Sequence, residues 1–184
     1  MFLLISVSAF AQKNKDSLVN NMPVIDGKLT YTDSITVKDR NGVVLDSLAK
    51  KWFDGYFKYH WTDSLTNGQN APGSVLSKAI LEFRASPNSY KIVYYNYIVL
   101  ITIKIDCKEG YYTYKISDVY FRPKNGFLNK VVIHPASADK VLDDYKKKNY
   151  SFWHIDGATL RNYLNCIDTS IRNCIASLNT AMTN

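Results

Sequence analysis

Cysteine and histidine are scarce in this chain, and neither has the spacing of a metal site. The three cysteines are Cys107, Cys166 and Cys174, and the three histidines are His60, His134 and His154. No His-x-x-x-His or Cys-x-x-Cys pair occurs, so a zinc site would have to be assembled from distant segments. The sequence therefore predicts no bound metal, and no cofactor motif is present.

The odd number of cysteines also excludes a complete set of intramolecular disulfides. Cys166 and Cys174 fall on one predicted helix, about 12 Å apart along its axis at the usual rise per residue. A disulfide needs α-carbons within about 7 Å, so these two do not pair in that helix. Pairing of Cys107 with either one stays geometrically open, although small buried thiols are the favoured state for all three.

Catalytic motifs are missing as well. No Gly-x-Ser-x-Gly elbow exists, and the residue types of a triad in the stretch 60–64 do not acquire triad geometry by adjacency. The neighbouring carboxylates Asp143 and Asp144 would point about 100° apart on a helix, as solvated surface groups do. An envelope-polymer hydrolase with a pocket near His60, Asp63 and His134 remains the alternative to a protein without enzymatic activity.

Long apolar runs are absent, apart from a short one at the start. Residues 1–11 are uncharged and end in Ala9-Phe10-Ala11, a small-x-small pattern typical of a signal peptidase site. About twenty residues are needed to span a bilayer, so this run is too short. We expect cleavage after Ala11, a polar lead over residues 12–22, and a protein exported to the periplasm or cell surface.

Acidic residues are fewer than basic ones, 16 against 23, giving a net charge of +7. For an exported protein this excess does not indicate nucleic acid. An anionic envelope surface or glycan stays open as a partner, beside the simpler reading of a solvated basic face. The hydrophobic fraction of 46% is that of a globular chain and predicts one domain.

What the sequence has in plenty is aromatic and β-branched residues, gathered in two extended runs. Residues 94–106 and 111–121 are joined by residues 107–110, and together they predict a long β-hairpin. In the first run one parity is wholly apolar and should face the helices, whereas the other becomes polar after Leu100. In the second run the parity changes at Ser117 and Asp118, which predicts a β-bulge.

The hairpin is preceded by other clear elements. Residues 29–37 and 75–85 are predicted strands. Between them the apolar residues follow helical spacing in one stripe, with Asp39 or Asn41 as the N-cap. The stripe residues are Leu45, Leu48, Ala49, Trp52, Phe53, Tyr56 and Phe57.

After residue 123 the pattern becomes helical. Residues 137–148 predict a short helix, and Asp156 can cap a last helix whose apolar stripe runs from Leu160 to Leu178. That stripe should pack on the sheet beside the first helix. The order β-α-β-β-β followed by helices predicts an α+β fold with an antiparallel sheet.

Three strings, in this order and spacing, resemble a family of secreted bacterial proteins. They are Pro23-Val24-Ile25-Asp26-Gly27-Lys28 with Tyr31, then Ala49-Lys50-Lys51-Trp52-Phe53 with Tyr56-Phe57, and then residues 110–118 (Gly-Tyr-Tyr-Thr-Tyr-Lys-Ile-Ser-Asp). The family is domain of unknown function 4468 (DUF4468), with a TATA-binding-protein-like (TBP-like) fold. The resemblance covers residues 23–123 and departs from the family in the strand 77–83. It implies a curved antiparallel sheet with helices on one side, and it points to no particular activity because none is established for the family. The helical extension over residues 124–184 lies outside the resemblance and is expected from the apolar pattern alone.

The sequence leaves one face of the hairpin without an assigned cover, and this face is the candidate contact surface. Its residues are Ile98, Leu100, Thr102, Lys104, Tyr111, Thr113 and Lys115. Lys104 and Lys115, on facing strands, either approach an anion or act as solubility charges. Asp118 is either a bulge carboxylate bonded to backbone amides or a ligand contact. We expect a non-enzymatic module that binds an envelope peptide, glycan or protein.

Overall fold

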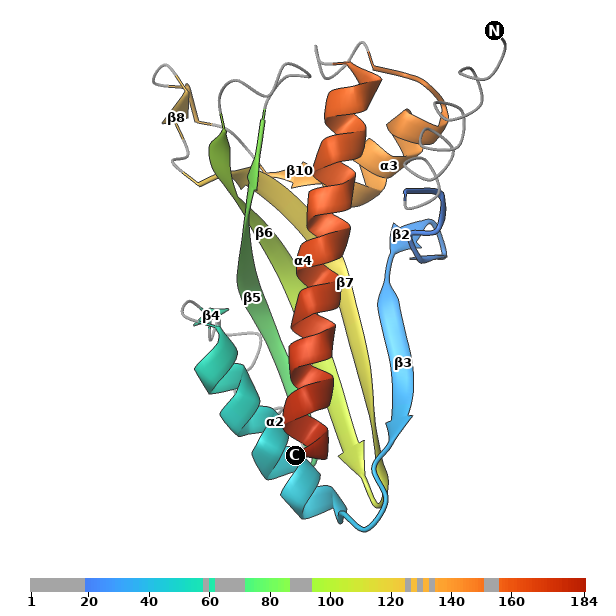
Figure 1. Cartoon of the computed structure of the whole chain (residues 1–184), viewed down its shortest axis with the longest axis vertical. Helices are drawn as coiled ribbons and strands as arrows, with labels where there is room; N and C mark the ends of the chain where they lie inside the picture. The colour runs from blue at the N-terminus through green and yellow to red at the C-terminus, as the bar shows by residue number, and fades with distance from the viewer. Residues whose placement is uncertain are drawn as a thin grey trace, which may run out of the picture.

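The chain was analysed as a computed structural model that describes residues 19–57, 72–86, 94–124, 135–150 and 156–184, and the backbone of 60–61, 127–128 and 131–132. Its long elements are one antiparallel sheet and the helices packed on it (Figure 1). The expected α+β fold is confirmed. The elements in chain order are β1 (Val24–Ile25), β2 (Lys28–Leu29), β3 (Tyr31–Thr36), α2 (Gly42–Tyr56), β4 (His60–Trp61), β5 (Ser74–Ala85), β6 (Tyr95–Lys108), β7 (Tyr111–Pro123), β8 (Phe127–Leu128), β9 (Val131–Val132), β10 (Ala136–Ser137), α3 (Ala138–Lys146) and α4 (Gly157–Thr183).

The predicted hairpin is the centre of the sheet. The main sheet has the order β10-β7-β6-β5-β4, and β3 also pairs with β7. The expected strand 29–37 is divided, because Leu29 pairs with Val24 in a separate small hairpin and β3 begins at Tyr31. The connection between β6 and β7 is shorter than predicted, since β6 continues to Lys108. Gly110 takes a φ of 74° in this tight turn, which suits glycine.

Helix α2 begins earlier than its apolar stripe, at Gly42, and its N-cap is Asn41. The Asn41 side chain accepts a hydrogen bond from the Val44 amide at 2.9 Å, which satisfies one free donor of the first turn. Leu45, Ala49 and Trp52 are buried, as the stripe predicts. Gly42 lies where a Cβ would come within 3.3 Å of the Lys108 backbone, so the helix start packs closely on the hairpin end.

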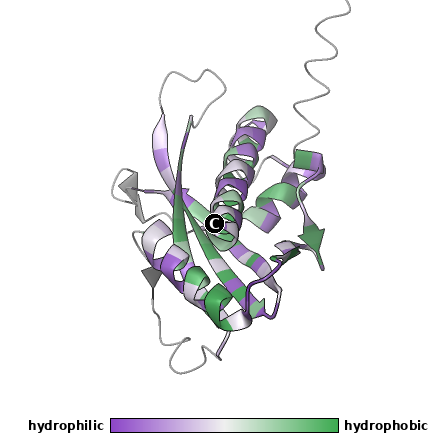
Figure 2. Cartoon of the chain, turned by 60° about the horizontal axis from the view of Figure 1, so that its bottom comes forward, coloured by the Kyte–Doolittle hydropathy of each residue, from purple (hydrophilic) through white to green (hydrophobic). Residues whose placement is uncertain are grey.

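The last helix lies on the same face of the sheet as α2. Asp156 caps it, accepting from the Thr159 amide at 2.6 Å, as predicted. Helix α4 packs against β5, α2 and α3, and Trp52 Nε1 of α2 donates to Ser177 Oγ of α4 at 3.1 Å. In Figure 2 apolar residues, in green, run along the strands that these helices cover. Both helices therefore share the core with the inner parity of the hairpin.

The core also contains polar groups, and three of their side-chain hydrogen bonds involve the last helix, whereas the buried Thr159 Oγ1 has no partner among the described residues. The buried Tyr31 hydroxyl donates to Asp168 Oδ1 at 2.8 Å, and the Tyr112 hydroxyl donates to Asn179 Oδ1 at 2.6 Å. Arg172 Nε donates to the other Asp168 oxygen at 2.8 Å. These bonds tie α4 to β3 and β7, because a buried hydroxyl without an acceptor costs about 1–3 kcal/mol.

All three cysteines are free thiols in the structure. Cys107 and Cys174 are buried, as predicted, whereas Cys166 is only half-buried. Burial raises the pKa of Cys174 to about 12. For Cys107 burial is again the main cause, and it raises the pKa to about 11.

Candidate functional site

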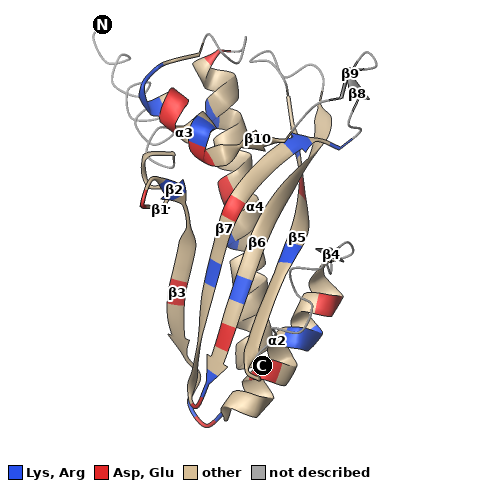
Figure 3. Cartoon of the chain, turned by 180° about the vertical axis from the view of Figure 1, so that it is seen from behind, with Lys and Arg blue, Asp and Glu red and all other residues tan. Residues whose placement is uncertain are grey.

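Helices α2, α3 and α4 lie on one face of the sheet, and Figure 3 views the opposite side, where β5, β6 and β7 lie in front of α4. We call this opposite side the outer face. Its residues include Lys78 and Ile80 of β5, Leu100, Thr102 and Lys104 of β6, and Thr113, Lys115 and Tyr120 of β7. The predicted contact surface is therefore not covered by the C-terminal helices.

The predicted bulge in β7 lies in the middle of the outer face. Leu100 pairs with Tyr120, but Thr102 pairs with Ser117, so the register shifts between them. Asp118, within the shift, has a φ of 52°. Aspartate tolerates this left-handed conformation better than most residues. The bulge exchanges the two parities of β7, and Tyr120 consequently points to the outer face with 42% of its surface exposed.

A hollow of about 210 Å³ lies beside the bulge. Leu100 and the Tyr120 ring contribute apolar surface to its lining, and Lys78 and Asp118 contribute an amine and a carboxylate. Its full lining is Lys78, Ala79, Leu100, Ile101, Thr102, Asp118 and Tyr120. Within the described ranges, neither the Lys78 amine nor the Asp118 carboxylate makes a hydrogen bond or ion pair. The expectation that backbone amides hold the Asp118 carboxylate is therefore not met, which leaves this carboxylate available to a ligand.

The outer face also carries two lysines that do not line the hollow. Lys104 and Lys115 are direct cross-strand partners. Lys104 Nζ lies 2.7 Å from Asp106 Oδ2, whereas Lys115 has no ion pair with any residue that the structure describes. Burial tends to raise the pKa of Asp106, but hydrogen bonds from Lys104 and Ser74 outweigh it and lower this pKa. Because the Asp106 carboxylate pairs with Lys104 alone, the two facing lysines leave a positive charge that an anionic group can neutralise.

The other predicted contact residues lie elsewhere on the face. Ile98 is only 6% exposed, so its inclusion in the contact surface is wrong. Its cross-strand neighbours are the long side chains Glu82 and Arg122, which the sequence pattern could not place. Tyr111 and Thr113 lie near the hairpin turn, where Lys108 Nζ stands 5.9 Å from the centre of the Tyr111 ring. The exposed part of the candidate contact surface therefore centres on Leu100 and Thr102.

The sequence analysis missed Lys78 and Tyr120 as members of the site. Lys78 lies on β5, and only the observed register brings it opposite Thr102. The predicted bulge also implies the place of Tyr120, because after the bulge the even-numbered residues of β7 point to the outer face.

The alternative hydrolase pocket falls largely outside the described residues. Asp63 and His134 are not among them, and for His60 only the backbone in β4 is described. Among the described residues, no group of His, Cys, Asp or Glu is arranged to hold a metal ion. Helices in the described ranges also lack the combined length and apolarity that a membrane span requires.

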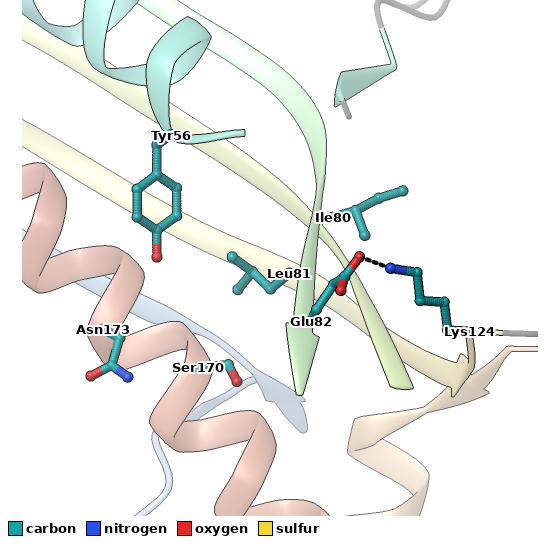
Figure 4. A pocket seen from close by; sticks show the side chains of 7 residues that line it. All are labelled: Tyr56, Ile80, Leu81, Glu82, Lys124, Ser170 and Asn173. Atoms are coloured by element: carbon teal, nitrogen blue, oxygen red, sulfur yellow. Dashed lines mark hydrogen bonds and ion pairs between the residues drawn. The ribbon is translucent and has the colours of Figure 1, made fainter. Parts of the chain in front are cut away.

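A second cavity, of about 430 Å³, lies at the β5 edge of the sheet (Figure 4). Tyr56 reaches it from α2, and Ser170 and Asn173 reach it from α4. The β5 residues Ile80, Leu81 and Glu82 also line it, together with Lys124. Lys124 Nζ and Glu82 Oε1 form an ion pair at 2.7 Å.

Comparison with protein-family models found no match, and neither did comparison with curated proteins. Two crystal structures resemble the chain. A TBP-like protein from Parabacteroides distasonis ATCC 8503 matches with a TM-score of 0.63 and 14% identity, over 88% of this chain and 96% of that one. A DUF4468 family protein from Bacteroides ovatus ATCC 8483 matches with a TM-score of 0.54 and 13% identity, over 85% and 90%. At such identities the likeness concerns the fold, and this chain has the TBP-like fold that the DUF4468 resemblance predicted.

Proposed function

We propose that this protein is a non-enzymatic binding module of the bacterial cell envelope, which holds a peptide, glycan or partner protein on its outer face. The observation that carries this proposal is the hollow beside the bulge. It lies on the face without helices and combines apolar walls with an amine and a carboxylate that have no partner among the described residues. A ligand that uses these two groups therefore breaks no hydrogen bond or ion pair that their side chains make with the described residues.

The chemistry of the hollow suits recognition better than catalysis. Lys78 lies on β5 and Asp118 on β7, two strand spacings apart, which is about 10 Å. A ligand that reaches both groups must therefore be extended and carry a hydrogen-bond acceptor and a donor at its two ends. Its middle would lie on Leu100 and the Tyr120 ring, where an aromatic surface gives contact area at little entropic cost.

The proposed envelope role rests on export. Residues 1–11 are uncharged and end in Ala9-Phe10-Ala11, a small-x-small pattern typical of a signal peptidase site. The outer face carries both signs of charge, since Asp106 lies on β6 and Asp118 on β7, the strands that also carry Lys104 and Lys115. Figure 3 shows red and blue positions along these strands. A surface of both signs fits a zwitterionic or polar ligand better than a phosphate backbone, so nucleic acid is not proposed.

Site-specific crosslinking tests this proposal. A photoreactive phenylalanine analogue replaces Tyr120 in the hollow, and the same analogue replaces Val43, which is 80% exposed on α2, as the matched control. After irradiation with the envelope fraction of the source bacterium, we expect at least tenfold more adduct from position 120. The adduct should disappear when unlabelled wild-type protein competes and should be weakened by Leu100→Lys. Equal adducts from both positions, or none from position 120, would reject the outer face as a binding surface.

A further inference from the structure

The strand β5 is paired along its whole length on one side but only briefly on the other. Toward β6 its pairing is continuous from Ser74 to Ala85. Toward β4 the pairs are His60 with Ala79 and Trp61 with Lys78, and no further pair is formed by the described residues. Residues 80–85 are consequently an open sheet edge within the part of the chain that the structure describes.

Two hydrogen bonds establish which backbone groups point outward along this edge. The Cys107 amide donates to the Gly73 carbonyl at 2.7 Å. The odd-numbered residues of β5 and β6 therefore direct their amide and carbonyl groups toward each other. The Lys124 amide donates to the Asn96 carbonyl at 2.7 Å. The even-numbered residues of β6 therefore direct their amide and carbonyl groups toward β7. Because the direction alternates along a strand without register shifts, Ile80, Glu82 and Arg84 direct their amide and carbonyl groups toward the open edge.

One contact from the helix layer supports this assignment. Cys166 Sγ of α4 lies 3.9 Å from the Arg84 carbonyl, at the distance limit for a thiol donor, so this carbonyl does point away from β6. A thiol is a weak donor and leaves the carbonyl largely free to accept a better one. Unpaired strand groups of this kind form a template for another strand.

The cavity in Figure 4 gives such a strand a place for its side chains. Its lining includes Ile80, whose side chain lies on the outer face, and Leu81, whose side chain lies on the inner face. The cavity therefore extends around the edge of the strand. On the helix side the cavity is lined by Tyr56 at the end of α2 and by Ser170 and Asn173 in the middle of α4. A strand laid beside residues 80–85 would direct alternate side chains into this space.

We infer that the open edge of β5 binds an extended peptide segment of a partner protein by strand addition, with one apolar side chain of the peptide seated between Tyr56 and Leu81. The backbone groups of Ile80, Glu82 and Arg84 supply the affinity, and the cavity selects the side chain. Glu82 and Arg84 carry opposite charges next to each other, which disfavours a peptide bearing a run of one sign. This surface is separate from the hollow on the outer face.

Proline at position 82 gives a sharp test, because it removes an amide that points to the open edge and leaves the β6 pairing intact. Glu82→Ala is the matched control, since it loses the same ion pair with Lys124 but keeps the amide. The probe is a displayed library of ten-residue peptides, selected on the wild-type chain and then measured by fluorescence anisotropy. We expect the selected peptides to bind wild type and Glu82→Ala alike and to lose at least tenfold in affinity with Glu82→Pro.

Arg84→Pro serves as a second blocking variant in case Glu82→Pro does not fold, and circular dichroism verifies each variant. Hydrogen exchange adds an independent readout. Without peptide the amides of residues 80, 82 and 84 should exchange faster than those of 81, 83 and 85, and peptide should protect the even set. Peptides that bind the folded proline variants unchanged would overturn the inference. It would also be overturned if a wild-type dimer that Glu82→Pro dissociates occupies the edge, because the occupant would then be a second copy.

Discussion

Trp52→Asp is expected to abolish folding. Trp52 is 7% exposed, its ring stacks on Tyr56 at 5.4 Å, and its indole nitrogen donates to Ser177 on the facing helix. A carboxylate at this position loses the burial of the ring and pays a desolvation cost of several kcal/mol, which together approach the roughly 5–15 kcal/mol stability of a domain. Thermal melts followed by circular dichroism measure the effect.

Tyr111→Ser is the matched control for this variant. Tyr111 is half-buried on the outer face near the hairpin turn, and Lys108 is the neighbour placed over its ring. Its loss should cost less than about 1 kcal/mol, as surface substitutions usually do. If Tyr111→Ser unfolds the protein as Trp52→Asp does, the outer face is part of the core and the binding proposal loses its basis.

Alkaline solution is expected to destabilise the protein steeply, starting near pH 9. Burial is the main cause that raises the pKa of Cys107 from 9.0 to about 11 and that of Cys174 from 9.0 to about 12. The pKa values of Tyr31, Tyr112 and Tyr163 also lie well above 10.0, again mainly through burial. The folded chain therefore keeps protons that the unfolded chain releases.

The sign follows from this difference. Below the unfolded pKa of each group, both states are protonated and its contribution to stability is complete. Above the unfolded pKa, the group loses its proton in the unfolded chain but keeps it in the folded one. The free energy of unfolding then falls by up to about 1.4 kcal/mol per pH unit for each such group, until the pH passes the folded pKa. The thiols act first, from about pH 9, and the tyrosines join from about pH 10.

Melting temperatures measured between pH 7 and 11 test this expectation. Tyr112→Phe removes a buried hydroxyl, so its melting temperature should fall less steeply above pH 10 than that of wild type. Tyr120→Phe changes a ring that is 42% exposed and provides the control. A melting temperature that stays level from pH 8 to pH 11 would contradict the assignment of these groups to the core.

The sequence predicted those features that depend on periodic burial. The stripe from Leu45 to Phe57 and the inner parity of β6 both bury large apolar side chains, and this repeated energy term leaves a pattern that sequence alone reveals. The Asn41 and Asp156 caps were predictable because each satisfies a local amide. The bulge was predictable because it reverses the parity of β7.

The contact surface was harder to predict, because it depends on neighbours distant in sequence. Ile98 lies between Glu82 and Arg122 of the two neighbouring strands, and the position of Lys78 depends on the register of β5 against β6. No pattern in the sequence indicates the open edge of β5. A predicted strand does not reveal how much of its length the preceding strand will pair.

The far edge of β7 has a consequence for the order of folding. It is shared between β3, which pairs with residues up to Ile116, and β10, which pairs with Tyr120 and Phe121. The β3 contacts span long loops, as for Thr32 and the Tyr114 carbonyl, 82 positions apart, whereas β5, β6 and β7 follow one another directly. Because long loops close late, we expect the three-stranded meander of β5, β6 and β7 to form first.

Pulsed hydrogen exchange tests this order. The amides of β6 should become protected before those of β3, and simultaneous protection would contradict the order. In this order of folding, the edge of β7 stays unpaired until β3 is added, and an unpaired strand edge is a site at which another chain can pair.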